Sequence, residues 1–180
     1  MISKTLAKAL NEQVNAEYYS AYLYHAMSAY AEDAAMKGAA NWLWMQAKEE
    51  MAHGIHIYQY ILDRDALPTF SAIEPPPAPS SFKSLLDVFE TVLAHEQKVT
   101  ALVNNIATLS MKENDHACYQ FIQWFVNEQV EEEANAKSVV DRLKLIGDNT
   151  GQLLTLDKEL GTRQFNNPFP TDSKLGGTVA

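Results

Sequence analysis

Four glutamates and one histidine stand where amphipathic helices would place apolar residues. Residues spaced alternately by three and four share one face of a helix, and four such faces run along this chain. Each face is apolar except near its middle, where it carries Glu17, Glu50, Glu96 or Glu132. His53 follows Glu50 by three residues and shares its face. The pattern predicts four carboxylates and one imidazole inside a helical core.

Carboxylates in a core need compensation, because burying an unpaired carboxylate is costly and four together also repel one another. Protonation, ion pairing or a bound metal can provide it, and no Lys or Arg lies on the four faces. Carboxylate oxygens with one imidazole suit Fe(II), Mn(II) and similar ions. Each residue alone is also compatible with a solvated or satisfied polar position. Four interruptions at one level favour a metal centre, and four carboxylates roughly neutralise two divalent ions.

Glycine and proline indicate the helices that position these residues. Residues 80–146 contain neither, and five of the seven prolines lie within 68–79. Since Gly and Pro are the residues that most destabilise a helix interior, their distribution predicts long helices. We expect helices from a cap at Ser3 to about Asp33, from about Gly38 to Asp65, from a cap at Ser81 to Ser110, from Asn114 or Asp115 to Ile146, and from about Asn149 to Leu160.

The connections predict how these helices are arranged. The first two helices and the next two are joined by a few residues, which is typical of antiparallel hairpins. The proline-rich segment 67–81 is stiff enough to run along the bundle as an extended crossover. One long crossover is a ferritin-like connectivity. We therefore expect an all-α four-helix bundle with a short fifth helix over residues 1–160, followed by a polar, disordered tail over 161–180.

Composition excludes several classes of protein. The chain has 23 acidic and 14 basic residues, a net charge of −9 and a pI near 4.9, whereas nucleic-acid binders usually present a basic face. Cys118 is the only cysteine, so neither an intrachain disulfide nor a Cys-based cluster is possible. No run of about 18 apolar residues is present. We expect a cytoplasmic protein with no membrane or nucleic-acid partner.

The motifs around the acids resemble those of the bacterial non-haem ferritins over about residues 1–160. Only one Glu-x-x-His is present, whereas the general di-iron bundle has two; a fourth helix with Gln129 and Glu132 is similar to ferritins proper. The four matching motifs, in chain order, are Asn11-Glu12-Gln13 with Glu17 and Tyr24, Glu49-Glu50-Met51-Ala52-His53, His95-Glu96-Gln97, and Asn127-Glu128-Gln129-Val130-Glu131-Glu132-Glu133.

The resemblance implies a di-iron ferroxidase centre. Glu17, Glu50 and His53 would hold the first iron, and Glu50 would bridge to a second iron completed by Glu96 and Glu132.

The resemblance also implies supporting residues around this centre. Gln129 would lie near bound oxygen or water, and Tyr24 would supply an electron. Trp124 is an alternative electron donor for which core packing is an equal explanation. A third iron site would use residues whose alternative role is a solvated acidic face: Glu49, Glu128 and Glu131.

As a whole, the resemblance implies iron storage: Fe(II) is oxidised with dioxygen or peroxide and kept as a ferric mineral inside a 24-subunit shell. Apolar residues on the second helix, including Trp42, Trp44 and Met45, are consistent with such assembly. Haem is not expected, although Met51 matches the haem-binding Met of bacterioferritins. A bacterioferritin- or rubrerythrin-like redox protein would need a second Glu-x-x-His or a CxxC. A metal-free helical scaffold would keep its acids protonated or paired.

Overall fold

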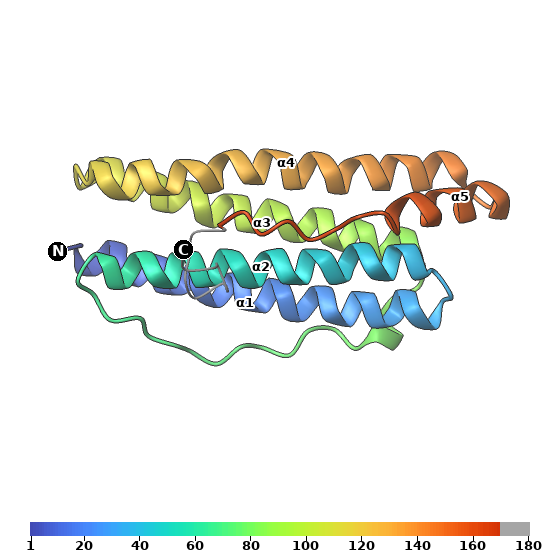
Figure 1. Cartoon of the computed structure of the whole chain (residues 1–180), viewed down its shortest axis with the longest axis horizontal. Coiled ribbons are helices and arrows are strands. Elements are labelled where there is room, and N and C mark those ends of the chain that lie inside the picture. Colours follow the sequence, from blue (N-terminus) through green and yellow to red (C-terminus); the bar gives the residue numbers. More distant parts are fainter. Residues whose placement is uncertain (170–180) are drawn as a thin grey trace, which may run out of the picture.

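The computed structural model describes residues 1–169, and residues 170–180 of the predicted tail lie outside the described residues. Four long helices run side by side, and a shorter helix follows at one end (Figure 1). No strand occurs within residues 1–169, so the predicted all-α bundle is confirmed. The elements are α1 (Lys4–Asp33), α2 (Lys37–Asp63), the 3-10 turn η1 (Pro79–Ser81), α3 (Leu85–Lys112), α4 (His116–Ile146) and α5 (Thr150–Leu160).

Side-chain caps set the starts of three of the long helices. Ser3 Oγ accepts from the backbone N–H of Leu6 at 3.1 Å, and Asp115 Oδ1 accepts from that of Cys118 at 2.9 Å, as predicted. The predicted cap at Ser81 is wrong, because Ser81 closes the turn η1 and α3 begins after Ser84. Ser84 Oγ accepts from the Asp87 N–H at 3.1 Å, while Asp87 accepts from the Lys83 N–H at 2.9 Å. This reciprocal pair, similar to a capping box, stabilises the later start.

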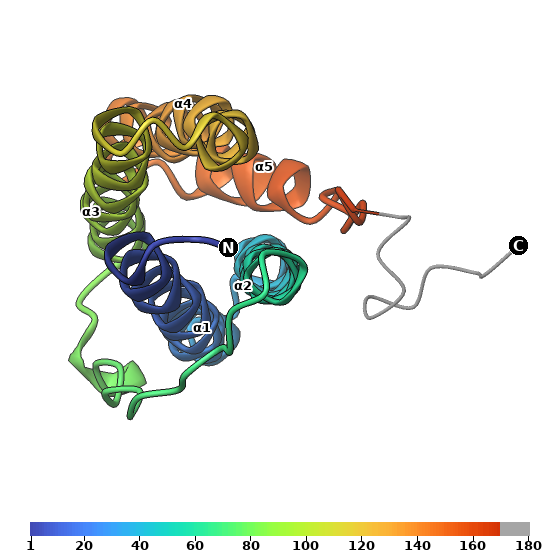
Figure 2. The ribbon, with the colours of Figure 1, turned by 90° about the vertical axis from the view of Figure 1, so that its left-hand side faces the viewer.

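The crossover and α5 complete the bundle. Residues 64–84 run along its outside from the end of α2 to the start of α3 (Figures 1 and 2). The helix α5 is fastened to the start of α2, because the Asp157 carboxylate accepts from the N–H groups of Gly38 at 3.0 Å and Ala39 at 2.8 Å. A Cβ at position 38 would lie 1.6 Å from the Asp157 carbonyl oxygen. Only glycine fits this contact.

Two apolar clusters fill the bundle, one on each side of a polar layer. One includes Met27, Leu43 and Phe89, and the other includes Leu10 and Ile57. The residues of the four predicted faces are buried, apart from Ile146 at the end of α4, which is half-buried. The predicted periodicity therefore identified the core, and it placed the acids in the layer between the clusters.

The segment 161–169, predicted to be part of the tail, lies along α2 and α4 without regular secondary structure (Figure 1). We call it the C-terminal strap. At its start, the Asn41 side-chain amide donates to the carbonyl oxygens of Gly161 at 3.3 Å and Arg163 at 2.9 Å. At its end, Phe169 is 8% exposed and stacks on His56 with ring centroids 3.7 Å apart. The strap thus has one anchor near each end.

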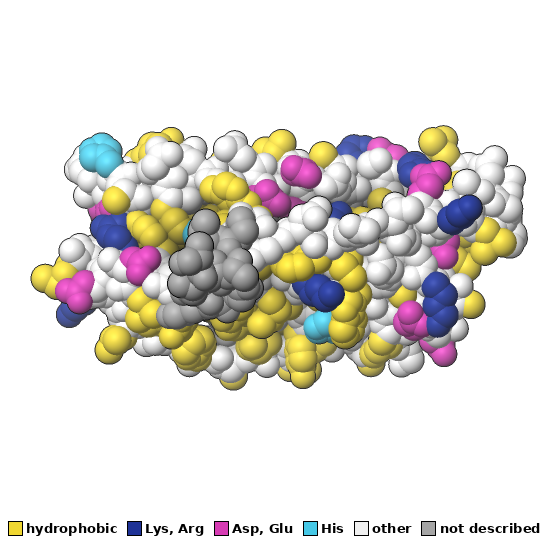
Figure 3. Space-filling view, viewed as in Figure 1, with side chains coloured by type: hydrophobic (Ala, Val, Ile, Leu, Met, Phe, Trp, Pro, Cys, Tyr) yellow, Lys and Arg dark blue, Asp and Glu magenta, His cyan; other side chains and the backbone are white. Residues whose placement is uncertain are grey.

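The outer surface is mixed in character. Figure 3 shows apolar, acidic and basic side chains interspersed on the face that carries the strap. Within residues 1–169, no helix combines the length and apolarity needed to cross a membrane.

Candidate metal centre

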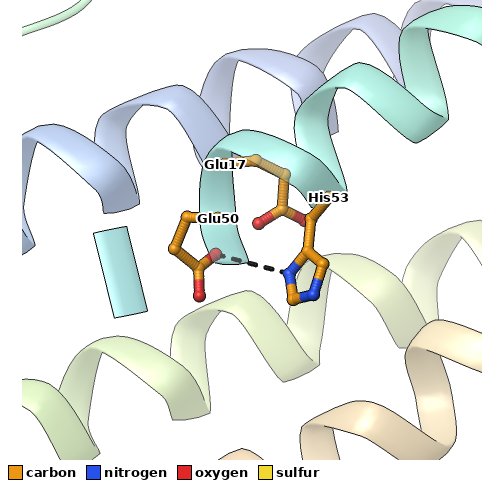
Figure 4. A group of neighbouring side chains, drawn as sticks. All are labelled: Glu17, Glu50 and His53. Atoms are coloured by element: carbon orange, nitrogen blue, oxygen red, sulfur yellow. Dashed lines mark ion pairs between the residues drawn. The ribbon is translucent and has the colours of Figure 1, made fainter. Parts of the chain in front are cut away.

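The five predicted ligands meet in the polar layer. Glu17 comes from α1, Glu50 and His53 from α2, Glu96 from α3 and Glu132 from α4, and each is at most 3% exposed. Ligand atoms of Glu17, Glu50 and His53 all lie within 4.8 Å of one another. His53 Nδ1 is 3.7 Å from Glu50 Oε2 (Figure 4). The polar positions of the four helix faces therefore converge in this layer.

The α1–α2 half of the centre, formed by Glu17, Glu50 and His53, contains polar atoms without partners. Gln13 Nε2 donates to Glu17 Oε1 at 2.7 Å. Glu17 Oε2 and His53 Nε2 are buried and have no hydrogen-bond partner. Buried polar atoms nearly always have a hydrogen-bond partner or a ligand. A bound cation would supply the missing partner of the Glu17 carboxylate. The donor set of two carboxylates and one imidazole fits a divalent first-row metal.

The α3–α4 half, formed by Glu96 and Glu132, is instead supplied with hydrogen bonds. The Tyr24 hydroxyl donates to Glu96 Oε1, and Gln129 Nε2 donates to Glu96 Oε2 at 3.1 Å. Gln46 Nε2 donates to Glu132 Oε2 at 2.7 Å. These carboxylates are held in place by protein donors from α1, α2 and α4.

Burial and mutual repulsion disfavour the charged form of these carboxyl groups unless a cation is present. Burial, and then the neighbouring Glu50, raise the pKa of Glu17 well above its ordinary value. Burial, and then Glu96, raise the pKa of Glu132 to about 8. Burial and Glu96 also raise the pKa of Glu50. Since a divalent ion favours the charged form of each carboxyl group, the centre has the electrostatics of a cation site.

Tyr24, which is fully buried, and the Trp124 ring pack beside the centre. Burial, and then Glu96, raise the pKa of the Tyr24 phenol well above its ordinary value, so the hydroxyl remains a donor. Trp124 packs edge-on against His53 at 5.4 Å and against Phe169 at 4.7 Å. Trp124 therefore has a packing role and is also in contact with a predicted ligand.

A second acidic group adjoins the centre and consists of Glu49, Glu128 and Glu131. Burial raises the pKa of Glu128, and Glu131 and Glu49 also raise it, whereas His53 lowers it. Glu49 and Glu128 are half-buried and Glu131 is exposed. Glu49 is paired with Arg163 of the strap. Glu128 thus lies close enough to the other two acids for their charges to act on it.

Three polar residues at the centre were missed from the sequence. Gln13 stands one turn before Glu17, a spacing that could have revealed it. Gln46 stands one turn before Glu50, but it donates to Glu132 on another helix, which no spacing predicts. Arg163 lies in a segment that was expected to be disordered. His95, to which no role was assigned from the sequence, is buried with its Nε2 2.7 Å from Ser20 Oγ, and burial lowers its pKa to about 4.

Comparisons with known proteins identify the family of this chain. A family model described as a ferritin-like domain matches residues 7–146. The bacterial non-heme ferritin of Staphylococcus haemolyticus is 45% identical over 167 residues, which cover 92% of this chain and 99% of that protein. The one from Staphylococcus aureus strain MRSA252 is 43% identical over 166 residues, 92% of this chain and 99% of that protein.

Solved structures give the same result. An Archaeoglobus fulgidus ferritin engineered into a closed form has a TM-score of 0.89 and 43% identity, covering 92% of this chain and 100% of that one. A humanized archaeal ferritin has a TM-score of 0.90 and 42% identity, covering 92% and 99%. Sequence and fold therefore match the same group of proteins along most of the chain.

Proposed function

The chain belongs to the ferritin family, and on that premise we propose that it stores iron by oxidising Fe(II) inside its helical bundle. The Fe(III) product is kept as a ferric mineral within a multisubunit cage. One observation carries the proposal: four buried carboxylates from four helices meet His53 in a layer where several polar atoms, Glu17 Oε2 and His53 Nε2 among them, have no partner. Such a layer is costly when empty and is satisfied by cations.

The two halves of the centre account for two iron ions. Glu17, Glu50 and His53 would hold the first, and Glu96 with Glu132 would hold the second. Glu50 would bridge them, which is supported by the effect of Glu96 and Glu132 on its pKa as well as by its place beside His53. A third ion would bind at Glu49, Glu128 and Glu131, and the effect of Glu131 and Glu49 on the pKa of Glu128 supports this site.

Iron is the substrate of this reaction, and each Fe(II) gives up one electron. Carboxylate oxygens favour the harder Fe(III), so the ligand set promotes oxidation. The proposed oxidant is dioxygen or peroxide. The Tyr24 hydroxyl and the Gln129 amide hold Glu96 in position. Tyr24 is buried next to the centre and could donate a further electron, and Trp124 beside His53 is the alternative donor.

The cage is proposed to contain 24 copies of this chain. Support comes from α2, where two large apolar side chains are left substantially exposed: Trp44 is 47% and Met51 41% exposed. Aromatic and Met residues are enriched at protein interfaces. No haem is proposed at Met51. The proposed location is the cytoplasm, which is consistent with a single, buried free cysteine, Cys118.

The test is the rate of Fe(II) oxidation in air, followed by the absorbance of Fe(III). Glu50→Ala removes the carboxylate shared by both halves, and we expect it to slow oxidation by about 100-fold or more, beyond the 10- to 100-fold typical of residues that only support a metal ligand. Glu74→Ala is the control, because Glu74 is exposed on the crossover. Equal rates for Glu50→Ala and the unmodified protein would disprove the assignment. Size-exclusion chromatography tests the cage separately.

A further inference from the structure

Arg163 of the C-terminal strap lies where a third metal ion would be expected. Its guanidinium Nη2 forms an ion pair with Glu49 Oε2, and the two side chains are only 21% and 15% exposed. Its charge also lowers the pKa of Glu128 and of Glu132. One cation of the chain itself therefore acts on the second acidic group and on a ligand of the centre.

The position of Arg163 is built by the fold. The guanidinium lies over the ring of Trp42, 4.9 Å from its centroid, and Trp42 is buried against Phe89 at 5.2 Å. The Asn41 amide fixes the Arg163 carbonyl oxygen at 2.9 Å. A cation over an aromatic face is attracted by the ring. These contacts hold the guanidinium beside Glu49.

The same position is incompletely satisfied. Arg163 Nε is buried and has no hydrogen-bond partner, and the strap has no regular secondary structure around it. A guanidinium can donate five hydrogen bonds, so a single pairing with Glu49 uses little of this capacity. The guanidinium neutralises Glu49 without being bound as firmly as it could be.

We propose that Arg163 is a built-in cation at the second acidic group, and that a metal ion binds Glu49 only by displacing its guanidinium. This inference rests on the proposed function of the chain, and it sets the order in which ions are taken up. The two ions of the centre bind with the strap in place. The third ion exchanges with Arg163 and releases the start of the strap from Glu49.

Zinc titration calorimetry tests the exchange, because Zn²⁺ accepts carboxylate and imidazole ligands and has no redox chemistry. We expect two tighter ions and one weaker ion per chain. In Arg163→Gln the weaker ion should bind on the order of tenfold more tightly, since the competing positive charge is gone. Arg163→Lys keeps the charge and should remain close to the unmodified protein. Arg142→Gln is the control, because Arg142 pairs with Glu159 of α5.

Hydrogen exchange supplies a second measurement. Amides of residues 161–169 should exchange faster when the third equivalent of Zn²⁺ is added, and not with the first two. Asn41→Ala removes the anchor at the start of the strap and leaves the Arg163 side chain unchanged, so it should also strengthen the third ion. An unchanged third affinity in both Arg163→Gln and Asn41→Ala, or an unchanged strap, would overturn the inference. If the unmodified protein did not bind the two tighter Zn²⁺ ions, that result would instead overturn the proposed function.

Discussion

The two halves of the candidate metal centre differ in how their buried polar atoms are partnered. In the α1–α2 half, Glu17 Oε2 and His53 Nε2 are buried without partners. In the α3–α4 half, both Glu96 oxygens accept hydrogen bonds, from Tyr24 and Gln129, and Glu132 accepts one from Gln46. The first half is incomplete without a cation, whereas the second is already supplied with donors. We therefore expect the first metal ion to bind more tightly in the α1–α2 half.

The difference between the halves affects how easily each one releases a metal ion. A carboxylate that already has protein donors loses less when a metal ion leaves, because its charge remains partly compensated. A half with unpartnered atoms gains more when an ion arrives. Release of the second ion is thus expected to be easier than release of the first, which suits a centre that passes iron onward.

The largest expected effect is the pH dependence of the stability of the metal-free protein, and it arises at Glu132 in the α3–α4 half. The pKa of Glu132 is raised from an ordinary value of 4.5 to about 8. Between these values the folded protein keeps a proton that the unfolded chain has lost, so stability falls as pH rises through this window. This residue alone should lower the free energy of unfolding by roughly 3 to 4 kcal/mol from pH 5 to pH 8.

Urea unfolding of the metal-free protein at pH 5 and pH 8 measures this effect. Glu132→Gln should remove most of the pH dependence contributed by that residue, and Glu74→Gln on the exposed crossover should leave it unchanged. Excess Zn²⁺ at pH 8 should restore stability, since metal binding to the folded state stabilises it. A metal-free protein that is equally stable at both pH values would contradict the electrostatic account of the centre.

The next effect distinguishes one half from the other. Glu17→Gln keeps the size of the side chain but removes a charged ligand from the α1–α2 half, and we expect it to weaken the tightest Zn²⁺ by about 100-fold. Glu132→Gln should weaken the second ion and leave the tightest one nearly unchanged. Mutation of a residue that only supports a metal ligand typically weakens metal affinity about 10- to 100-fold. Loss of a ligand itself should therefore weaken it by about 100-fold.

Calorimetry resolves the two ions if their affinities differ as expected. The difference between the halves would be disproved if Glu132→Gln weakened the tightest ion as much as Glu17→Gln does. Glu50→Ala, which alters both halves, should weaken both ions and so provides the reference for complete loss.

Helical periodicity was enough to predict that the side chains of the candidate ligands are buried, but not their hydrogen-bond partners. Glu17, Glu96 and Glu132 each interrupt an apolar face of a single helix, so they can be recognised from spacing within that helix. Gln46 donates to Glu132 across the bundle, 86 positions away in sequence, and such a contact depends on how α2 and α4 pack. Arg163 depends on a strap without periodicity. The cap was predicted at Ser81 because the proline-initiated turn before α3 was not anticipated.

The smallest effect concerns two glutamines that support opposite halves. Gln13 Nε2 donates to Glu17 Oε1 and Gln46 Nε2 donates to Glu132 Oε2, both at 2.7 Å. Each amide holds one oxygen of its glutamate, and in Glu17 this leaves the unpartnered Oε2 free to bind metal. Gln13→Leu should therefore weaken the tightest Zn²⁺ by about tenfold, and Gln46→Leu the second ion by a similar factor. Each variant is the control for the other, because both lose a buried amide of the same size. If either variant affected both ions equally, the two halves would be coupled through their glutamines and could not be treated as separate sites.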